Sequence, residues 1–204
     1  MKKFALLIVI FAAAGFLAYK LLSDRGPKTP EKKDQPLRFS KNSTVFNTAF
    51  TLFLNEYYSL KDALVQWDSV KADQAAYSLA AMADSLPLKQ LKGDSSIVLT
   101  AQSLAASVSS EAKAFTGETG LEARRRAFNM LTDEMYTFIH AVHYDGEVIY
   151  HMRCPMAFQD SVEGFWLSNS SKIVNPYMGD KHPVYKSKML GCGEIVDSVN
   201  LAGK

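Results

Sequence analysis

The sequence is poor in cysteine, close to neutral in charge, and without the short motifs that identify common enzymes. Its 204 residues include two cysteines and have a formal net charge of +2. Two cysteines exclude a disulfide-rich scaffold, because they allow one bridge at most. The small net charge and the lack of a basic and aromatic stripe give no support for nucleic-acid binding. Nucleic acid is therefore not an expected partner.

Catalytic signatures are also missing from the sequence. It has no Gly-rich phosphate loop, no nucleophile elbow and no Ser-His-Asp pattern. Asp160 and Glu163 lie near Trp166, but two carboxylates without an accompanying pocket do not indicate hydrolysis. We therefore expect a protein that is not an enzyme.

What the sequence does contain begins with an export signal. Residues 1–3 read MKK, and the next sixteen residues carry no charge. A basic start followed by an apolar run is typical of a signal peptide or a membrane anchor, and we assign residues 1–22 to one of these. There is no lipobox cysteine and no clean A-x-A cleavage site, and only Lys20 interrupts residues 4–22. These features favour a retained single-pass anchor.

The compartment follows from this segment. Lys2 and Lys3 would stay on the cytoplasmic side. The rest of the chain would lie on the periplasmic side of the inner membrane, or free in the periplasm if the signal is cleaved, and cysteines can oxidise there. Residues 23–43 contain three prolines and many charges of both signs. They are too polar to form a core, so we expect a flexible linker.

Residues 44–143 carry four stretches with apolar residues at helical spacing. The first stretch has Phe46, Phe50, Phe53, Tyr57, Leu60, Leu64 and Trp67, the second Ala72, Ala76, Leu79, Ala83 and Leu86, the third Ile97, Ala101, Leu104, Val108 and Phe115, and the fourth Leu121, Phe128, Leu131, Met135, Phe138 and Val142. Four amphipathic helices with short connections predict a mainly α fold, an antiparallel up-down four-helix bundle. The alanine-rich second helix should allow close approach of its neighbours. Three methionines on or beside these stretches are expected in the core, namely Met82, Met130 and Met135.

Turn and cap signals separate the four predicted helices. Pro87 ends the second helix, and either Asp94 or Ser95 can cap the third. Thr119 and Glu122 have the spacing of a capping box for the fourth. The basic run at residues 124–126 is expected on a solvated face, with one arginine paired to an acidic residue.

The pattern changes to turns and short strands from residue 144. Asp145-Gly146 is a turn signal, and the alternating residues after it predict a strand. Residues 164–185 are rich in turn signals and are expected to form loops. Residues 193–199 predict a last short strand. An irregular segment of this length is usually held by a function or a cross-link, so we expect residues 144–199 to pack on the bundle as a metal-binding loop and strand segment.

Six segments carry a resemblance to a known family. They are YYSLKDALVQWDSVKADQAAYSLA, RRRAFNMLTDEMYTFI, CPMAF, FWLS, IVNPYMG and MLGCGE. In this order they resemble an uncharacterised bacterial periplasmic domain family, found alone or fused to heavy-metal efflux adaptors of the CusB type. The resemblance covers roughly residues 45–197 and implies a helical domain with a C-terminal heavy-metal-binding segment for copper. The residues that match the motif are Cys154, Met156, Met189 and Cys192.

One insertion departs from the family pattern. In the family, the NPY.G element is followed almost directly by ML.CG. Here the segment DKHPVYKSK separates Gly179 from Met189 and adds His182.

The chemistry of the residues points in the same direction as the resemblance. The stretch YHMRCPMAF, residues 150–158, places three sulfur side chains at every second position, so they share one face of a strand. These are Met152, Cys154 and Met156, while His151 and Arg153 point to the other face. Thiolate and thioether groups are soft ligands that select Cu(I) or Ag(I).

A second half-site follows in the stretch KMLGCGE. Met189 and Cys192 can converge on one side of a turn, and Gly191 and Gly193 can let the backbone wrap closely. Zinc is less suitable, because the paired C-x-x-C spacing is missing. The expected metal ligands, in order, are Cys154, Cys192, Met156 and Met189, followed by Met152, His151 and His182. We expect an exported copper-binding protein that sequesters the metal or delivers it to an efflux adaptor or pump.

A structural disulfide is the alternative for the same cysteines. Cys154 and Cys192 are 38 residues apart, and a bridge between them would stabilise the fold by about 3 to 4 kcal/mol in the chain-entropy model. The chain would then be a non-metal periplasmic interaction module without a cofactor. The two states can also be redox alternatives of one site.

Overall fold

The structure is a computed structural model that describes residue 20, residues 42–159 and residues 161–201. The described residues from 42 to 201 belong to one compact unit. The predicted signal or anchor, apart from Lys20, lies outside the described residues, as does the predicted linker up to residue 41. Among the residues that are described, no helix is long and apolar enough to cross a bilayer.

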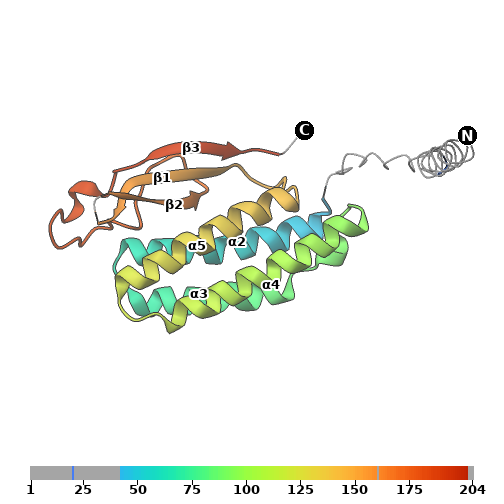
Figure 1. The fold of residues 1–204 in the computed structure, drawn as a ribbon, viewed down its shortest axis with the longest axis horizontal. Helices are drawn as coiled ribbons and strands as arrows, with labels where there is room; N and C mark the ends of the chain where they lie inside the picture. The colour runs from blue at the N-terminus through green and yellow to red at the C-terminus, as the bar shows by residue number, and fades with distance from the viewer. Residues whose placement is uncertain (1–19, 21–41, 160, 202–204) are drawn as a thin grey trace, which may run out of the picture. The chain divides into compact units, whose positions relative to one another are not determined.

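Four helices form a bundle, and a small sheet lies over one side of it (Figure 1). The helices are α2 (Thr44–Val65), α3 (Ser69–Ser85), α4 (Ser95–Gly117) and α5 (Leu121–Ala141), and a short 3-10 helix follows α3 at Leu88–Gln90. Consecutive helices pack against each other. Every apolar position in the four predicted stretches is buried or half-buried. The predicted mainly α fold with a four-helix bundle is therefore confirmed.

The seams of the bundle differ in side-chain size. The rings of Phe50 and Phe138 lie 5.2 Å apart, and Tyr57 stacks on Phe128 at 5.3 Å, so large aromatic groups fill the space between α2 and α5. The buried side chains of α3 are mostly alanine. Since a methyl group takes little room, the backbone of α3 lies close to those of α2 and α4, as predicted.

The helix ends agree with the sequence signals in part. The Asp94 carboxylate accepts hydrogen bonds from the backbone N–H groups of Ser96 and Ile97 and caps α4, as predicted. The predicted capping box at Thr119 is wrong. Gly120 occupies the N-cap position of α5 with a positive φ of 85°, and no side chain caps this helix. Trp67 lies beyond the end of α2, with a φ of 59°.

Asn42 and Ser43 already belong to the fold. Asn42 is buried, and its side-chain amide donates to the carbonyl groups of Val142 and His143 at the far end of α5. The Ser43 hydroxyl accepts from the N–H of Phe46 and caps α2. The sequence predicts a linker up to residue 43, but the folded unit starts at residue 42 or before.

Two side-chain expectations in the helices were wrong. Met130 is 57% exposed, whereas Met135 is buried and Met82 is half-buried. Arg124 forms the predicted ion pair, with Asp73 of α3 at 2.9 Å. Arg125 was expected on a solvated face but is buried.

Three antiparallel strands form the sheet, in the order β2-β1-β3. They are β1 (Ile149–Phe158), β2 (Val162–Ser168) and β3 (Glu194–Val199). The first and last strands were predicted. The sequence expectation of a loop from residue 164 onward was wrong for residues 164–168, which belong to β2.

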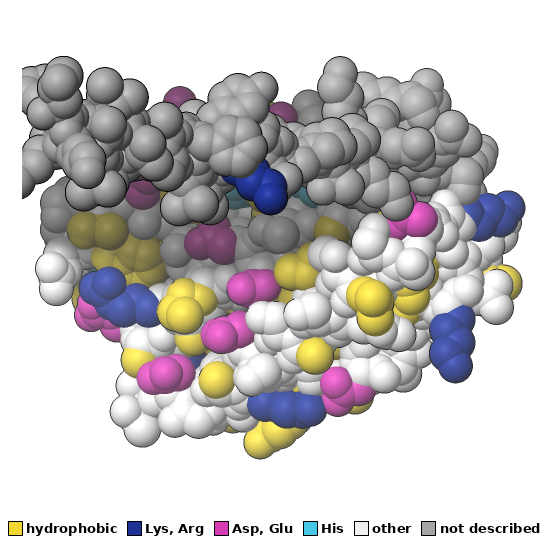
Figure 2. All heavy atoms as spheres, turned by 45° about the vertical axis from the view of Figure 1, so that its right-hand side comes forward, with side chains coloured by type: hydrophobic (Ala, Val, Ile, Leu, Met, Phe, Trp, Pro, Cys, Tyr) yellow, Lys and Arg dark blue, Asp and Glu magenta, His cyan; other side chains and the backbone are white. Residues whose placement is uncertain are grey.

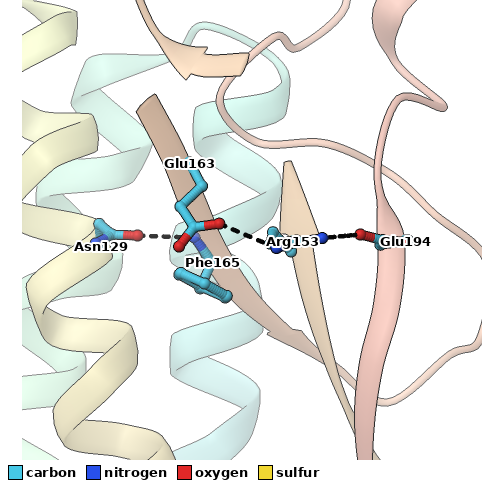
Figure 3. A network of polar contacts seen from close by, with 5 residues as sticks. All are labelled: Asn129, Arg153, Glu163, Phe165 and Glu194. Carbon is cyan, nitrogen blue, oxygen red and sulfur yellow. Dashed lines mark hydrogen bonds and ion pairs between the residues drawn. The ribbon is translucent and has the colours of Figure 1, made fainter. Parts of the chain in front are cut away.

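Strand β2 is an edge strand whose outer backbone groups are satisfied by the helices. The N–H of Phe165 donates to the Asn129 side chain of α5 at 2.7 Å (Figure 3). The N–H of Leu167 donates to the Tyr57 hydroxyl of α2 at 3.1 Å. Buried backbone donors need such partners, so these two side chains attach the sheet to the bundle.

The three strands are also joined by one ionic network on the exposed face. Arg153 of β1 lies between Glu163 of β2 and Glu194 of β3 and pairs with both (Figure 3). Elsewhere on the surface, basic and acidic side chains are interspersed on the face drawn in Figure 2.

Candidate metal centre

Strand β1 and the turn before β3 bring the two cysteines together. Cys154 lies in β1 opposite Gly164 of β2, and its neighbour Arg153 pairs with Glu194, the first residue of β3. Cys192 precedes Glu194 by two residues, in the turn that enters β3, and it lies close enough to Cys154 to affect the pKa of the Cys154 thiol. Both cysteines are free thiols, with Cys154 buried and Cys192 half-buried.

The two thiols lie close enough for Cys192 to affect the ionisation of Cys154. Burial raises the pKa of the Cys154 thiol above its ordinary value, and the charge of the neighbouring Cys192 thiol and its hydrogen bond act in the same direction. Hydrogen bonds from the Asn175 side chain and the Met156 backbone oppose this effect on the pKa. Cys154 is therefore a protonated thiol at neutral pH, and a metal ion that binds there must displace its proton.

Asn175 fixes the backbone around Cys192. Its buried side-chain amide donates to the carbonyl oxygen of Cys192 at 2.7 Å, and its backbone N–H donates to the carbonyl of Leu190 at 2.8 Å. Its side-chain oxygen accepts from the N–H groups of Tyr177 and Met178. The sequence identified Asn175 only as a turn signal before proline, and no local pattern distinguishes a buried asparagine of this kind from a turn residue.

Gly193 is required where the turn enters β3. Its φ is 142°, and a Cβ atom there would lie 2.7 Å from the Arg153 carbonyl oxygen and 2.8 Å from the Trp166 ring. The expected role of Gly193 in close wrapping of the backbone is therefore confirmed. Gly191 has no positive φ and no atom within 4 Å of an added Cβ, so the same expectation is wrong for Gly191.

The methionines of the predicted site lie close to the cysteines in the sequence, and all three are buried or half-buried. Met189 ends a short 3-10 helix at Ser187–Met189, and its carbonyl accepts the N–H of Cys192 at 3.0 Å, which confirms the predicted turn. Met156 and Met189 are both half-buried and pack against the core. Met152 is fully buried, two residues before Cys154.

His151 lies on the other face of β1, as the alternation predicts. Its ring stacks on Tyr136 of α5 at 4.3 Å and is tilted against Phe165 at 5.2 Å. Its Nε2 atom is buried without a hydrogen-bond partner. Burial lowers the pKa of His151, a nearby Asp197 carboxylate raises it, and His140 lowers it.

His182 lies in the inserted loop, beside the end of α2. Its ring stacks on Tyr185 at 4.9 Å and meets the edge of Trp67 at 6.0 Å. Its Nδ1 atom accepts hydrogen bonds from the backbone N–H groups of Val184 and Tyr185. A neutral imidazole with Nδ1 as acceptor carries its proton on Nε2.

The two thiols are therefore the metal-binding side chains that the fold brings together at this place. In the part of the chain that the structure describes, no three His, Cys, Asp or Glu side chains come together as a metal-binding group. Neither His151 nor His182 joins the thiol pair in such a group. Two thiols, with methionines close to them in the sequence, suit a soft cation of low coordination number.

Comparisons with known proteins concern the helical part of the chain. No curated protein matches the sequence, and no solved structure matches it either. Residues 53–146, which run from α2 to the turn before β1, are similar to the family described as "Protein of unknown function (DUF3347)".

Proposed function

We propose that the chain is an exported protein that binds a soft metal ion, Cu(I) or Ag(I), through Cys154 and Cys192. The observation that carries the proposal is that the fold brings two free thiols, 38 positions apart in the sequence, close enough for one to affect the pKa of the other. Thiolates bind soft monovalent cations strongly, and two of them can hold Cu(I) in a low-coordinate geometry. The half-buried thioethers of Met156 and Met189 are the further ligands.

The composition of the site supports a soft metal over a hard one. Calcium and magnesium need several oxygen ligands, and structural zinc sites use four Cys, His or carboxylate ligands. No cluster of three such residues exists within residues 42–159 and 161–201. Thioethers favour Cu(I) and Ag(I), so the site selects these ions by ligand type.

The biological role in this proposal is metal sequestration or delivery to an efflux adaptor or pump. Its support is the sequence: an export signal in residues 1–22 and a resemblance to domains that are fused to efflux adaptors. The protein would work on the periplasmic side of the inner membrane, anchored by residues 4–22 and spaced from the bilayer by a linker. Intact mass of the protein isolated from bacterial membranes shows whether residues 1–22 are retained.

The test is a Cu(I) competition titration on the reduced full-length chain. We expect the Cys154→Ser/Cys192→Ser variant to lose affinity about a hundredfold or more, because both thiolate bonds are removed. Met156→Leu and Met189→Leu should each lower the affinity by a smaller factor. Met130→Leu is the matched control, since Met130 is an exposed thioether on α5. Unchanged binding by the double serine variant would disprove the metal site.

The same thiol contact also supports a second candidate, an interaction module closed by a Cys154–Cys192 disulfide. Export to an oxidising compartment favours such a bridge. Alkylation of unreduced protein followed by intact-mass measurement separates the two states. Two added alkyl groups indicate free thiols, whereas none before reduction and two afterwards indicate the disulfide.

A further inference from the structure

A cavity of about 270 Å³ lies between the start of α5, Trp67 beyond the end of α2, the end of β1 and the loop that follows Gly179. Its lining includes Trp67, Arg125, Phe158, Tyr177 and His182. The lining combines these aromatic rings with aliphatic and polar side chains and one buried cation. Small-molecule sites commonly combine apolar walls with a few placed polar groups.

Arg125 is the unusual member of this lining. The side chain is only 7% exposed, and within the described part of the chain it has no carboxylate partner. Its Nε atom donates to the carbonyl oxygen of Pro176 at 3.1 Å, while its Nη2 atom is buried without a hydrogen-bond partner. A buried charge is normally paired, and an unsatisfied buried donor costs about 1 to 3 kcal/mol.

The surroundings hold this guanidinium in one place. Trp67 lies against its face, with the Arg125 carbon Cζ 4.3 Å from the ring centroid. The indole N–H of Trp67 donates to the Met178 carbonyl at 3.2 Å, and Gly179 fits tightly against the same ring. Burial lowers the pKa of Arg125 to about 10, so the group remains a cation at neutral pH.

The other ionic groups at the cavity do not neutralise Arg125. Glu122 lines the cavity, but its carboxylate accepts from Arg126 at 2.9 Å. Arg126 in turn lies over the Phe158 ring, with its Cζ atom 4.5 Å from the ring centroid. These residues form a balanced pair at the rim and leave one uncompensated positive charge in the cavity.

We propose that this cavity binds a small monocarboxylate with a short apolar body, its carboxylate accepting from the guanidinium of Arg125 and its body lying against the aromatic side chains of the lining. A single desolvated cation matches a single negative charge, and arginine donors bind carboxylates with strong charge-assisted hydrogen bonds. Inorganic phosphate is more highly charged and has no apolar body, so it fits this lining less well. The site is separate from the cysteine pair and does not depend on the proposed metal.

Nuclear magnetic resonance of the full-length chain tests the site through its tryptophans. The protein has two indole N–H groups, Trp67 at the cavity and Trp166 in the core. Trp67→Phe identifies the cavity resonance. Titration with benzoate should shift the Trp67 signal to saturation and leave Trp166 unchanged, while benzyl alcohol and inorganic phosphate should bind at least about tenfold more weakly.

Two neighbouring arginines give the matched variants. Arg125→Gln should weaken benzoate binding about tenfold or more, and Arg124→Gln, which removes the same charge outside the cavity, should change it less than about twofold. Equal losses in both variants would overturn the proposal. So would equal binding of benzoate and benzyl alcohol, or tighter binding of phosphate, by the wild-type protein. The ligand comparison decides the question even if Arg125→Gln does not fold.

Discussion

The side-chain amide of Asn175 donates to the carbonyl oxygen of Cys192 at 2.7 Å. This hydrogen bond joins the turn at residues 175–178 to the turn at residues 189–192. The same side chain accepts from Tyr177 and Met178 and lies within hydrogen-bond reach of the Cys154 thiol. One buried amide therefore contacts both halves of the candidate site. Groups that hydrogen-bond to metal ligands or to the backbone beside them orient those ligands and set their geometry.

Asn175→Ala should destabilise the fold and weaken metal binding together. The variant leaves the Cys192 carbonyl and two backbone N–H groups without their partner, at a cost of about 2 to 4 kcal/mol. Urea unfolding measures the loss, with Asn55→Ala on the exposed face of α2 as a near-neutral control. On the metal hypothesis, Cu(I) affinity of folded Asn175→Ala falls about 10- to 100-fold. An unchanged free energy of unfolding would show that the side-chain hydrogen bonds of Asn175 contribute little to stability.

Gly193→Ala and Gly191→Ala form a matched pair on either side of Cys192. The added methyl at position 193 would meet the Arg153 carbonyl oxygen and the Trp166 ring, in a backbone conformation with a positive φ. We expect a loss of about 1 to 3 kcal/mol for Gly193→Ala. Gly191→Ala meets open space and should be neutral or slightly stabilising, because it reduces the freedom of the unfolded chain. Thermal unfolding of the two variants checks the difference, and similar effects would contradict it.

Tyr57→Phe tests how the sheet is attached to the bundle. The Tyr57 hydroxyl accepts from the Leu167 N–H at 3.1 Å and bonds with the Thr132 hydroxyl at 2.7 Å. Its loss leaves a buried backbone donor unpaired, so we expect a destabilisation of about 1 to 3 kcal/mol. Hydrogen exchange at the Leu167 amide should also become faster. Tyr77→Phe, at an exposed position on α3, should change neither quantity.

The helices were predictable because their signals are local. Apolar side chains three or four positions apart define a buried stripe, and Asp94 marks a helix start through bonds to residues two and three positions away. The turn at residues 189–192 was also predictable, because Met189 and Cys192 are close in the chain. These features need no knowledge of distant partners.

The features that the sequence did not reveal depend on distant partners. Strand β2 was missed because its outer N–H groups bond to Asn129 and Tyr57, more than thirty positions away. Arg125 looks like one of three surface arginines, yet Trp67 and the Pro176 carbonyl enclose it. In the sequence Asn175 is a turn signal before proline, whereas in the fold it is buried and its side chain joins two turns by hydrogen bonds. In each case tertiary contacts, and not local propensity, decide the role.

His151 predicts how stability changes with pH. Burial lowers its pKa in the folded state, where the ring stacks on Tyr136 and its Nε2 atom has no partner. The unfolded chain therefore binds a proton at about pH 6.5, while the folded chain binds it only at lower pH. Below that pH the unfolded state holds more protons, so the free energy of unfolding falls as the pH falls. Above it, the contribution is fully present.

His151→Phe keeps an aromatic ring against Tyr136 but removes the titrating group. Urea unfolding of wild type and variant between about pH 5 and 8.5 should show parallel curves above about pH 7.5, and a steeper decline of the wild type below about pH 6.5. The difference in slope is the expected result, whatever the offset between the two curves. Equal slopes in the acidic range would mean that His151 is protonated in the folded state as readily as in the unfolded chain, and that its stacked position on β1 does not disfavour the charge.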